Sequence, residues 1–90
     1  GTFGNLCANG YFELAKFVYK SFNNTNIQDN INYPFRSTCY KGHLEIAQWL
    51  YSISNIPIDF IDDTFMYTCA EGQLHIIQWL LPLTNNIKII

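Results

Sequence analysis

The chain repeats itself, and this internal repeat constrains its fold more than any other feature. Glycines at 10, 42 and 72 are spaced by 32 and 30 residues, and cysteines at 7, 39 and 69 and phenylalanines at 3, 35 and 65 keep these two intervals. Residues 35–50 and 65–80 are identical at nine of sixteen positions, and residues 3–18 match 35–50 at five of sixteen. Periods of this size are typical of arrays whose units stack to bury a shared core.

Each unit has the pattern of two short helices. In the second unit, Pro34 suits the first helical position, where its missing N–H would have had no partner. Gly42 ends that helix, and we expect it to adopt the left-handed conformation, which is cheap only for glycine. After it, Leu44, Ala47 and Leu50 follow at helical spacing.

The segments between the helix pairs are predicted to be loops. Asn23–Asn32 and Ser52–Asp63 are rich in Asn, Asp and Pro, which mark turns. Helices this short are marginal in water by themselves and must stack on neighbours. We therefore predict an all-α solenoid of about three stacked helix-turn-helix repeats, covering residues 1–28, 29–60 and 61–90.

The composition suggests that the array continues beyond these residues. Charged residues make up 13% of the chain, roughly half the usual share. Terminal repeats of self-sufficient arrays carry a polar outer face, but the last unit is apolar and includes Ile76, Ile77, Trp79, Leu80, Leu81 and the final run 87–90. We expect flanking repeats of the same chain to cover it.

Charge and hydropathy argue against several classes of partner. The net charge is -2, and the five Lys and Arg residues are scattered, so there is no basic stripe for nucleic acid. The longest nearly apolar stretch, Ile76–Leu83, contains Gln78 and Pro82 and is far shorter than the ~20 residues needed to cross a membrane. An odd number of cysteines favours a reducing compartment, so we expect an intracellular, cytoplasmic protein.

The second unit resembles the ankyrin repeat. Its run Tyr33–Ala47 (YPFRSTCYKGHLEIA) is similar to the ankyrin pattern T-P-L-H-x-A-A-x-x-G-H-L-E-I-V, most specifically at Gly42–Ile46. The Phe-x-x-x-Cys and Gln-Trp-Leu motifs are similar to those of divergent ankyrin arrays in large DNA viruses and protists. If the chain is a viral member, this resemblance implies a location in the host cytoplasm. The resemblance implies a scaffold that binds other proteins, with no cofactor and no catalytic residues.

The chain departs from the ankyrin pattern in two respects. The T-P-L-H tetrapeptide survives in part, as Tyr33–Arg36 and Asp63–Met66, with Asp63 suited to cap the helix that follows. The intervals of 32 and 30 residues are shorter than the family period of about 33. The missing residues fall between helix pairs, so we expect the β-hairpin fingers of the family to be short or irregular.

The chemically reactive residues have structural explanations. The cysteines lack the spacing of a zinc site and take a small-residue position where two helices pack, so we expect all three in the core. Neither His43, expected to satisfy backbone groups at the turn, nor the solvated His75 belongs to a recognisable catalytic triad. Phe17, Trp49 and Trp79 share one position, which we expect in the core rather than in an exposed strip. The acidic group Asp59, Asp62 and Asp63 lacks the pattern of a calcium loop and is interpreted as a solvated loop.

The ankyrin resemblance places a protein partner on the concave face, built by the first helices and the fingers. The corresponding positions differ strongly between repeats, as expected where packing does not fix them: Ala8, Asn9, Asn32, Arg36, Tyr40, Lys41, Asp62, Met66, Ala70 and Glu71. Tyr40 and Arg36 are the best anchors, because both residue types are favoured at binding hot spots. The alternative is a structural spacer that holds other parts of a longer array apart.

Overall fold

A computed structural model describes residues 1–22 and 31–84, and all the regular secondary structure in these residues is helical. The all-α class predicted from the sequence is confirmed. The helices are α1 (Thr2–Ala8), α2 (Phe12–Ser21), α4 (Asn32–Lys41), α5 (Leu44–Ile53), α6 (Ile58–Glu71) and α7 (Leu74–Leu80), followed by the short 3-10 helix η1 (Leu81–Leu83).

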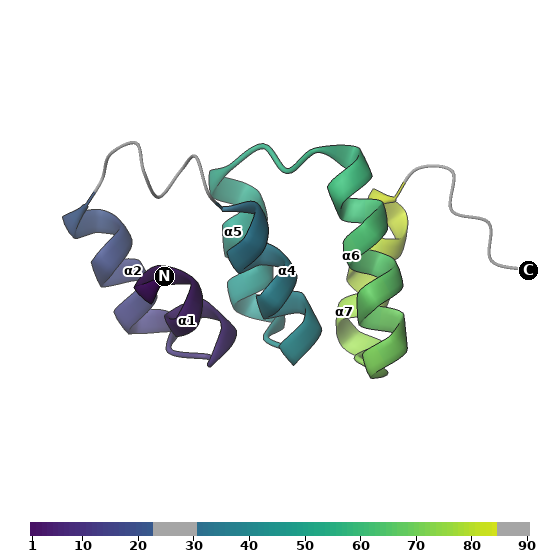
Figure 1. Ribbon diagram of the computed structural model, residues 1–90, viewed down its shortest axis with the longest axis horizontal. Coiled ribbons are helices and arrows are strands. Elements are labelled where there is room, and N and C mark those ends of the chain that lie inside the picture. The colour runs from purple at the N-terminus through teal and green to yellow at the C-terminus, as the bar shows by residue number, and fades with distance from the viewer. Residues whose placement is uncertain (23–30, 85–90) are drawn as a thin grey trace, which may run out of the picture.

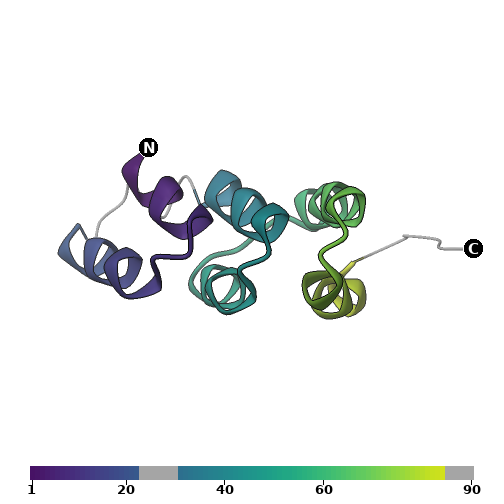
Figure 2. The same ribbon diagram turned by 90° about the horizontal axis from the view of Figure 1, so that it is seen from below.

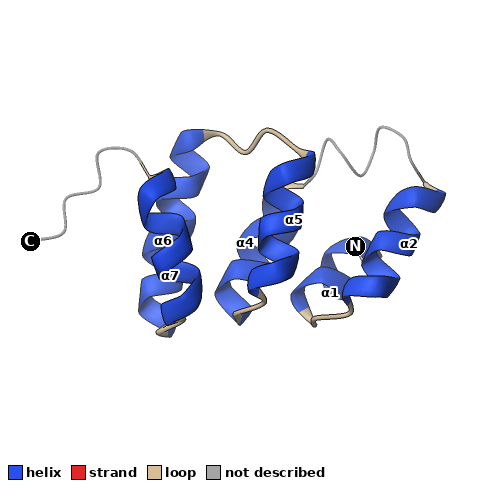
Figure 3. Cartoon of the chain, turned by 180° about the vertical axis from the view of Figure 1, so that it is seen from behind, coloured by secondary structure: helices blue, strands red, loops and turns tan. Residues whose placement is uncertain are grey.

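The helices form three antiparallel pairs in a row (Figure 1). The first helices α1, α4 and α6 make one layer, and the second helices α2, α5 and α7 make the other (Figure 2). The row is elongated, with extents of 44 × 21 × 18 Å. The tight turn within each pair lies at one edge, and the link from α5 to α6 lies at the opposite edge (Figure 3).

A left-handed glycine closes the turn inside each pair. The φ angles of Gly10, Gly42 and Gly72 are 86°, 88° and 72°, which confirms the conformation predicted for Gly42. The amide of Gly42 donates to the Cys39 carbonyl at 3.0 Å, and the His43 amide donates to the Thr38 carbonyl at 3.1 Å. These bonds satisfy carbonyls that the end of α4 would leave without partners, and they turn the chain into α5.

The core runs along the row between the two layers. Each pair contributes a Phe from its first helix and aliphatic residues from its second, and the most buried large side chains include Phe35, Phe65, Leu50 and Leu80. Trp49 and Trp79 are half-buried and pack against this core. Phe17 occupies the same repeat position as these two tryptophans but is 66% exposed. Its expected core placement is wrong, because no helix pair lies before α1–α2 in the described residues.

Helix α6 begins earlier than the sequence suggested. The predicted loop Ser52–Asp63 is wrong, because α5 runs to Ile53 and α6 starts at Ile58. Asp59, Asp62 and Asp63 are therefore helical, and Pro57 rather than Asp63 is the N-cap residue. The repeat boundary expected at residue 61 falls inside α6, and the boundary at 28/29 lies outside the described residues.

The start of α4 differs in a smaller way. Asn32, assigned to a linker, is the first residue of the helix, so Pro34 is the third rather than the first. The third amide of a helix also lacks an intrahelical acceptor, so proline is still tolerated there. The link between α5 and α6, Ser54–Pro57, contains no strand. Residues 23–30, in the link between α2 and α4, lie outside the described residues.

Candidate protein-binding surface

Two parallel stripes of side chains face the same side of α4 and α6. Residues four apart on a helix lie on one face, so Asn32, Arg36 and Tyr40 form a stripe on α4. Asp62, Met66 and Ala70 occupy the equivalent positions on α6. The two helices pack directly against each other, which brings the two stripes next to one another.

Arg36 is held between aromatic rings. Its guanidinium carbon lies 4.8 Å from the ring centroid of Phe60, 4.9 Å from that of Tyr67 and 5.4 Å from that of Tyr33. The rings of Tyr33 and Phe60 meet edge to face at 5.8 Å. Cation–π contacts with three rings from two helices hold the planar group in place and leave the side chain little rotamer freedom.

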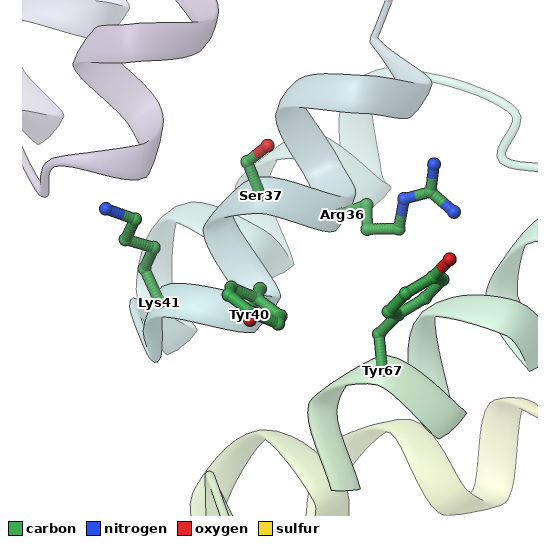
Figure 4. A pocket seen from close by; sticks show the side chains of 5 residues that line it. All are labelled: Arg36, Ser37, Tyr40, Lys41 and Tyr67. Atoms are coloured by element: carbon green, nitrogen blue, oxygen red, sulfur yellow. The ribbon is translucent and has the colours of Figure 1, made fainter. Parts of the chain in front are cut away.

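An open pocket of about 330 Å³ lies beside this arginine, lined by Arg36, Ser37, Tyr40, Lys41 and Tyr67. Figure 4 shows Tyr67 of α6 directed towards Arg36 of α4, whereas Lys41 extends away from α6. Tyr40 and Tyr67 are 38% and 52% exposed. The pocket thus offers two accessible phenol rings and two cationic side chains on a rigid helical support.

The two helices also exchange polar contacts across the pocket's edge. A hydrogen bond from Tyr40 to the Glu71 carboxylate, together with the negative charge of Glu71, raises the pKa of the Tyr40 phenol. The backbone carbonyl of Tyr40 accepts a hydrogen bond from Nε2 of Gln73 at 3.1 Å. Both the side chain and the backbone of Tyr40 therefore contact the last helix pair.

The remaining predicted site residues divide into those that reach the surface and those that do not. Met66 is 59% exposed, Ala70 and Glu71 are exposed, and Asn32 and Asp62 are half-buried on the two stripes. Asn9 is exposed at the end of α1, where its Nδ2 donates to the Asn5 carbonyl at 2.9 Å. Ala8 is 9% exposed, so it offers almost no accessible side chain and its placement on the face is wrong.

Sequence reasoning missed the residues that complete the pocket and hold Arg36. Ser37 and Tyr67 occupy one repeat position, and Asn5 is their equivalent in the first unit. The three residues differ from one another, which is the same signal that selected the other surface positions. Phe60 was missed because it lies in the segment expected to be a loop.

The cysteines do not share one environment. Cys7 and Cys39 are buried, and burial raises the pKa of each thiol to about 12, so neither provides a thiolate nucleophile near neutral pH. Cys69 is exposed, and its predicted core placement is wrong because no helix pair packs on α6 from the far side within residues 1–22 and 31–84. The described residues hold no group of three or more His, Cys, Asp or Glu that could bind a metal ion.

No helix in the described part of the chain has the length and apolar character required to cross a bilayer. Comparisons with known proteins give no further identification: no family model, no curated protein and no solved structure matches the chain.

Proposed function

We propose that this chain is a divergent ankyrin-type segment that binds another protein through the first-helix layer, chiefly at the Arg36–Tyr40–Tyr67 pocket. The observation that carries the proposal is the arginine fixed between three rings beside two exposed tyrosines. Arg and Tyr are among the residue types enriched at binding hot spots, and rigid anchors lose little entropy on binding.

The arrangement of the helix pairs supports the ankyrin-type part of the proposal. The first helices are in close backbone contact, α1 with α4 and α4 with α6. The second helices instead have large rings between them, such as Trp49 against Tyr19 and Trp79 against Tyr51. Closer spacing in one layer curves the row towards that layer, so the pocket would lie on the concave side, where ankyrin-like arrays bind their partners.

A comparison of variants in one pull-down tests the proposal. The immobilised chain would be exposed to a cell lysate beside Tyr40→Ala, Arg36→Lys and the control Gln48→Ala, which alters an exposed residue of α5. We expect a specific partner to bind the parent and Gln48→Ala equally and Tyr40→Ala about tenfold more weakly, since truncating a hot spot costs more than about 1 kcal/mol. Arg36→Lys keeps the charge but loses the planar group, so it should also weaken binding.

The outcomes separate the proposal from its alternative. A partner retained equally by all four proteins would bind elsewhere on the molecule and would overturn the assigned surface. The absence of any specifically retained protein would favour the spacer role. Circular dichroism of each variant would establish whether the helices are intact. We expect them to be intact in Tyr40→Ala, because the Tyr40 side chain is exposed and lies outside the core.

A further inference from the structure

One contact recurs at both junctions between helix pairs: a ring from a second helix packs back onto the preceding pair. The Trp49 ring centroid lies 5.4 Å from that of Tyr19, 5.6 Å from that of Phe12 and 6.0 Å from that of Phe3. At the next junction, Trp79 lies 5.7 Å from Tyr51 and 6.1 Å from Phe35. Tyr51 and Phe35 are the repeat equivalents of Tyr19 and Phe3, so the two junctions have the same construction.

A second contact recurs at the turns. The residue after each turn glycine reaches back to the glycine of the preceding pair. A Cβ atom on Gly10 would lie 2.8 Å from Cε1 of His43, and one on Gly42 would lie 2.5 Å from Oε1 of Gln73. At each junction the later pair therefore projects one ring and one polar side chain. The polar side chain lies over the turn glycine of the earlier pair. The ring packs on a socket in the earlier pair, formed by Phe3, Phe12 and Tyr19 at the first junction and by Phe35 and Tyr51 at the second.

The first helix pair carries the projecting half of this junction with nothing to receive it in the described structure. Phe17 occupies the position of Trp49 and Trp79, and its side chain is 66% exposed. Tyr11 occupies the position of His43 and Gln73 and is 59% exposed. Both are aromatic side chains whose equivalents at the two internal junctions are half-buried.

The last helix pair carries the receiving half, and it is open. Leu74 and Leu81, which replace Phe12 and Tyr19 in the socket, are 62% and 45% exposed. A Cβ atom on Gly72 would meet nothing within 4 Å, in contrast to Gly10 and Gly42. The two ends of the row thus present complementary halves of an interface that the molecule already forms twice internally.

We propose that this chain associates with second copies of itself head to tail, with Phe17 of one copy packed on Leu74 and Leu81 of the next. Tyr11 of the first copy would then lie over Gly72 of the second, as His43 and Gln73 lie over the preceding glycines. Because the two contacting surfaces differ, the interface does not close on itself, and it produces linear oligomers that lengthen with concentration. The interface leaves the Arg36–Tyr40–Tyr67 pocket uncovered, so it is independent of the proposed partner binding.

Sedimentation velocity with complementary variants tests this proposal. Phe17→Glu removes the projecting ring and leaves the socket, whereas Leu81→Glu alters the socket and leaves the ring. We expect the parent to sediment as a concentration-dependent series of oligomers and each variant to remain a monomer. An equimolar mixture of the two variants keeps one intact interface and should form a 1:1 dimer that grows no further.

Gln48→Glu is the matched control, because it places the same charge on an exposed side chain of the middle pair, away from both ends of the row. It should associate like the parent. If Leu81→Glu unfolds the last pair, as circular dichroism would reveal, Leu74→Glu replaces it. A parent that is monomeric at all concentrations, variants that associate like the parent, or a mixture that stays monomeric while the parent associates would each overturn the proposal.

Discussion

The middle helix pair, α4–α5, and the last pair, α6–α7, have nearly the same sequence but different surroundings. Residues 35–50 and 65–80 share nine of sixteen amino acids. Cys39 is buried and Cys69 is exposed, and Leu44 is half-buried where Leu74 is 62% exposed. The repeat sequence therefore specifies the helix pair itself, whereas the burial of a given position depends on whether another pair packs on it.

The largest expected difference between the two pairs is at their turn glycines. A side chain at either Gly42 or Gly72 is strained by about 1–2 kcal/mol, because both glycines are left-handed. At Gly42 the new side chain also displaces Gln73, whereas Gly72 has open space around it. The total stability is about 5 kcal/mol, so Gly42→Val should unfold much of the middle pair. Gly72→Val should lower the free energy of unfolding by the backbone strain alone.

Urea midpoints of the two glycine variants measure this difference. Equal losses of stability would mean that the contact between Gly42 and Gln73 does not contribute to the free energy of unfolding. A Gly42→Val chain as stable as the parent would remove the helix-glycine-helix assignment altogether.

A smaller difference is expected at the cysteines. Cys39→Ala deletes a buried sulfur and leaves a small cavity, so it should lower the free energy of unfolding by about 1–2 kcal/mol. Cys69→Ala removes an exposed side chain and should change stability by less than about 0.5 kcal/mol. Denaturant unfolding of the two variants under reducing conditions checks this, and a larger loss at Cys69 would contradict the assigned burial.

The smallest individual shifts in stability are expected at two threonines that share one repeat position. Oγ1 of Thr38 is buried without a hydrogen-bond partner among the described residues, whereas Oγ1 of Thr68 donates to the Thr64 carbonyl at 2.7 Å. Thr38→Val should raise the free energy of unfolding by about 0.5–1 kcal/mol, because it removes a desolvated hydroxyl with no compensating bond. Thr68→Val should lower it by a similar amount, and identical shifts in the two thermal melts would disprove the distinction.

Much of the fold could be predicted because the repeat fixes helix pairs and turns. The three turn glycines and the apolar spacing after them locate, to within a few residues, five of the six α-helices of residues 1–22 and 31–84. The start of α6 was missed because Pro57 and the three aspartates have the composition of a loop. Proline before a helix and Asp59 in its first turn also favour a helix start, and Ile58, Ile61 and Phe65 follow at helical spacing.

The candidate site was predicted in outline and completed by the structure. Variation between repeats found Arg36, Tyr40 and Lys41, which line the pocket together. It could not reveal that Phe60 and Tyr33 hold the arginine, because such a contact depends on how closely α6 approaches α4. Nor could it separate Cys69 from the other two cysteines, since their surroundings differ by a neighbouring helix pair and not by their own repeat.

The rates at which a thiol reagent modifies the three cysteines test the central claim most directly. We expect Cys69 to react at once in the native protein at pH 8, and Cys7 and Cys39 to react after the chain opens, since both are buried and burial raises their pKa to about 12. Mass spectrometry of a monomeric sample such as Phe17→Glu would follow each site separately. Rapid modification of Cys69 with protection of the other two supports position-dependent burial in a row of equivalent helix pairs; equal rates at all three sites would contradict it.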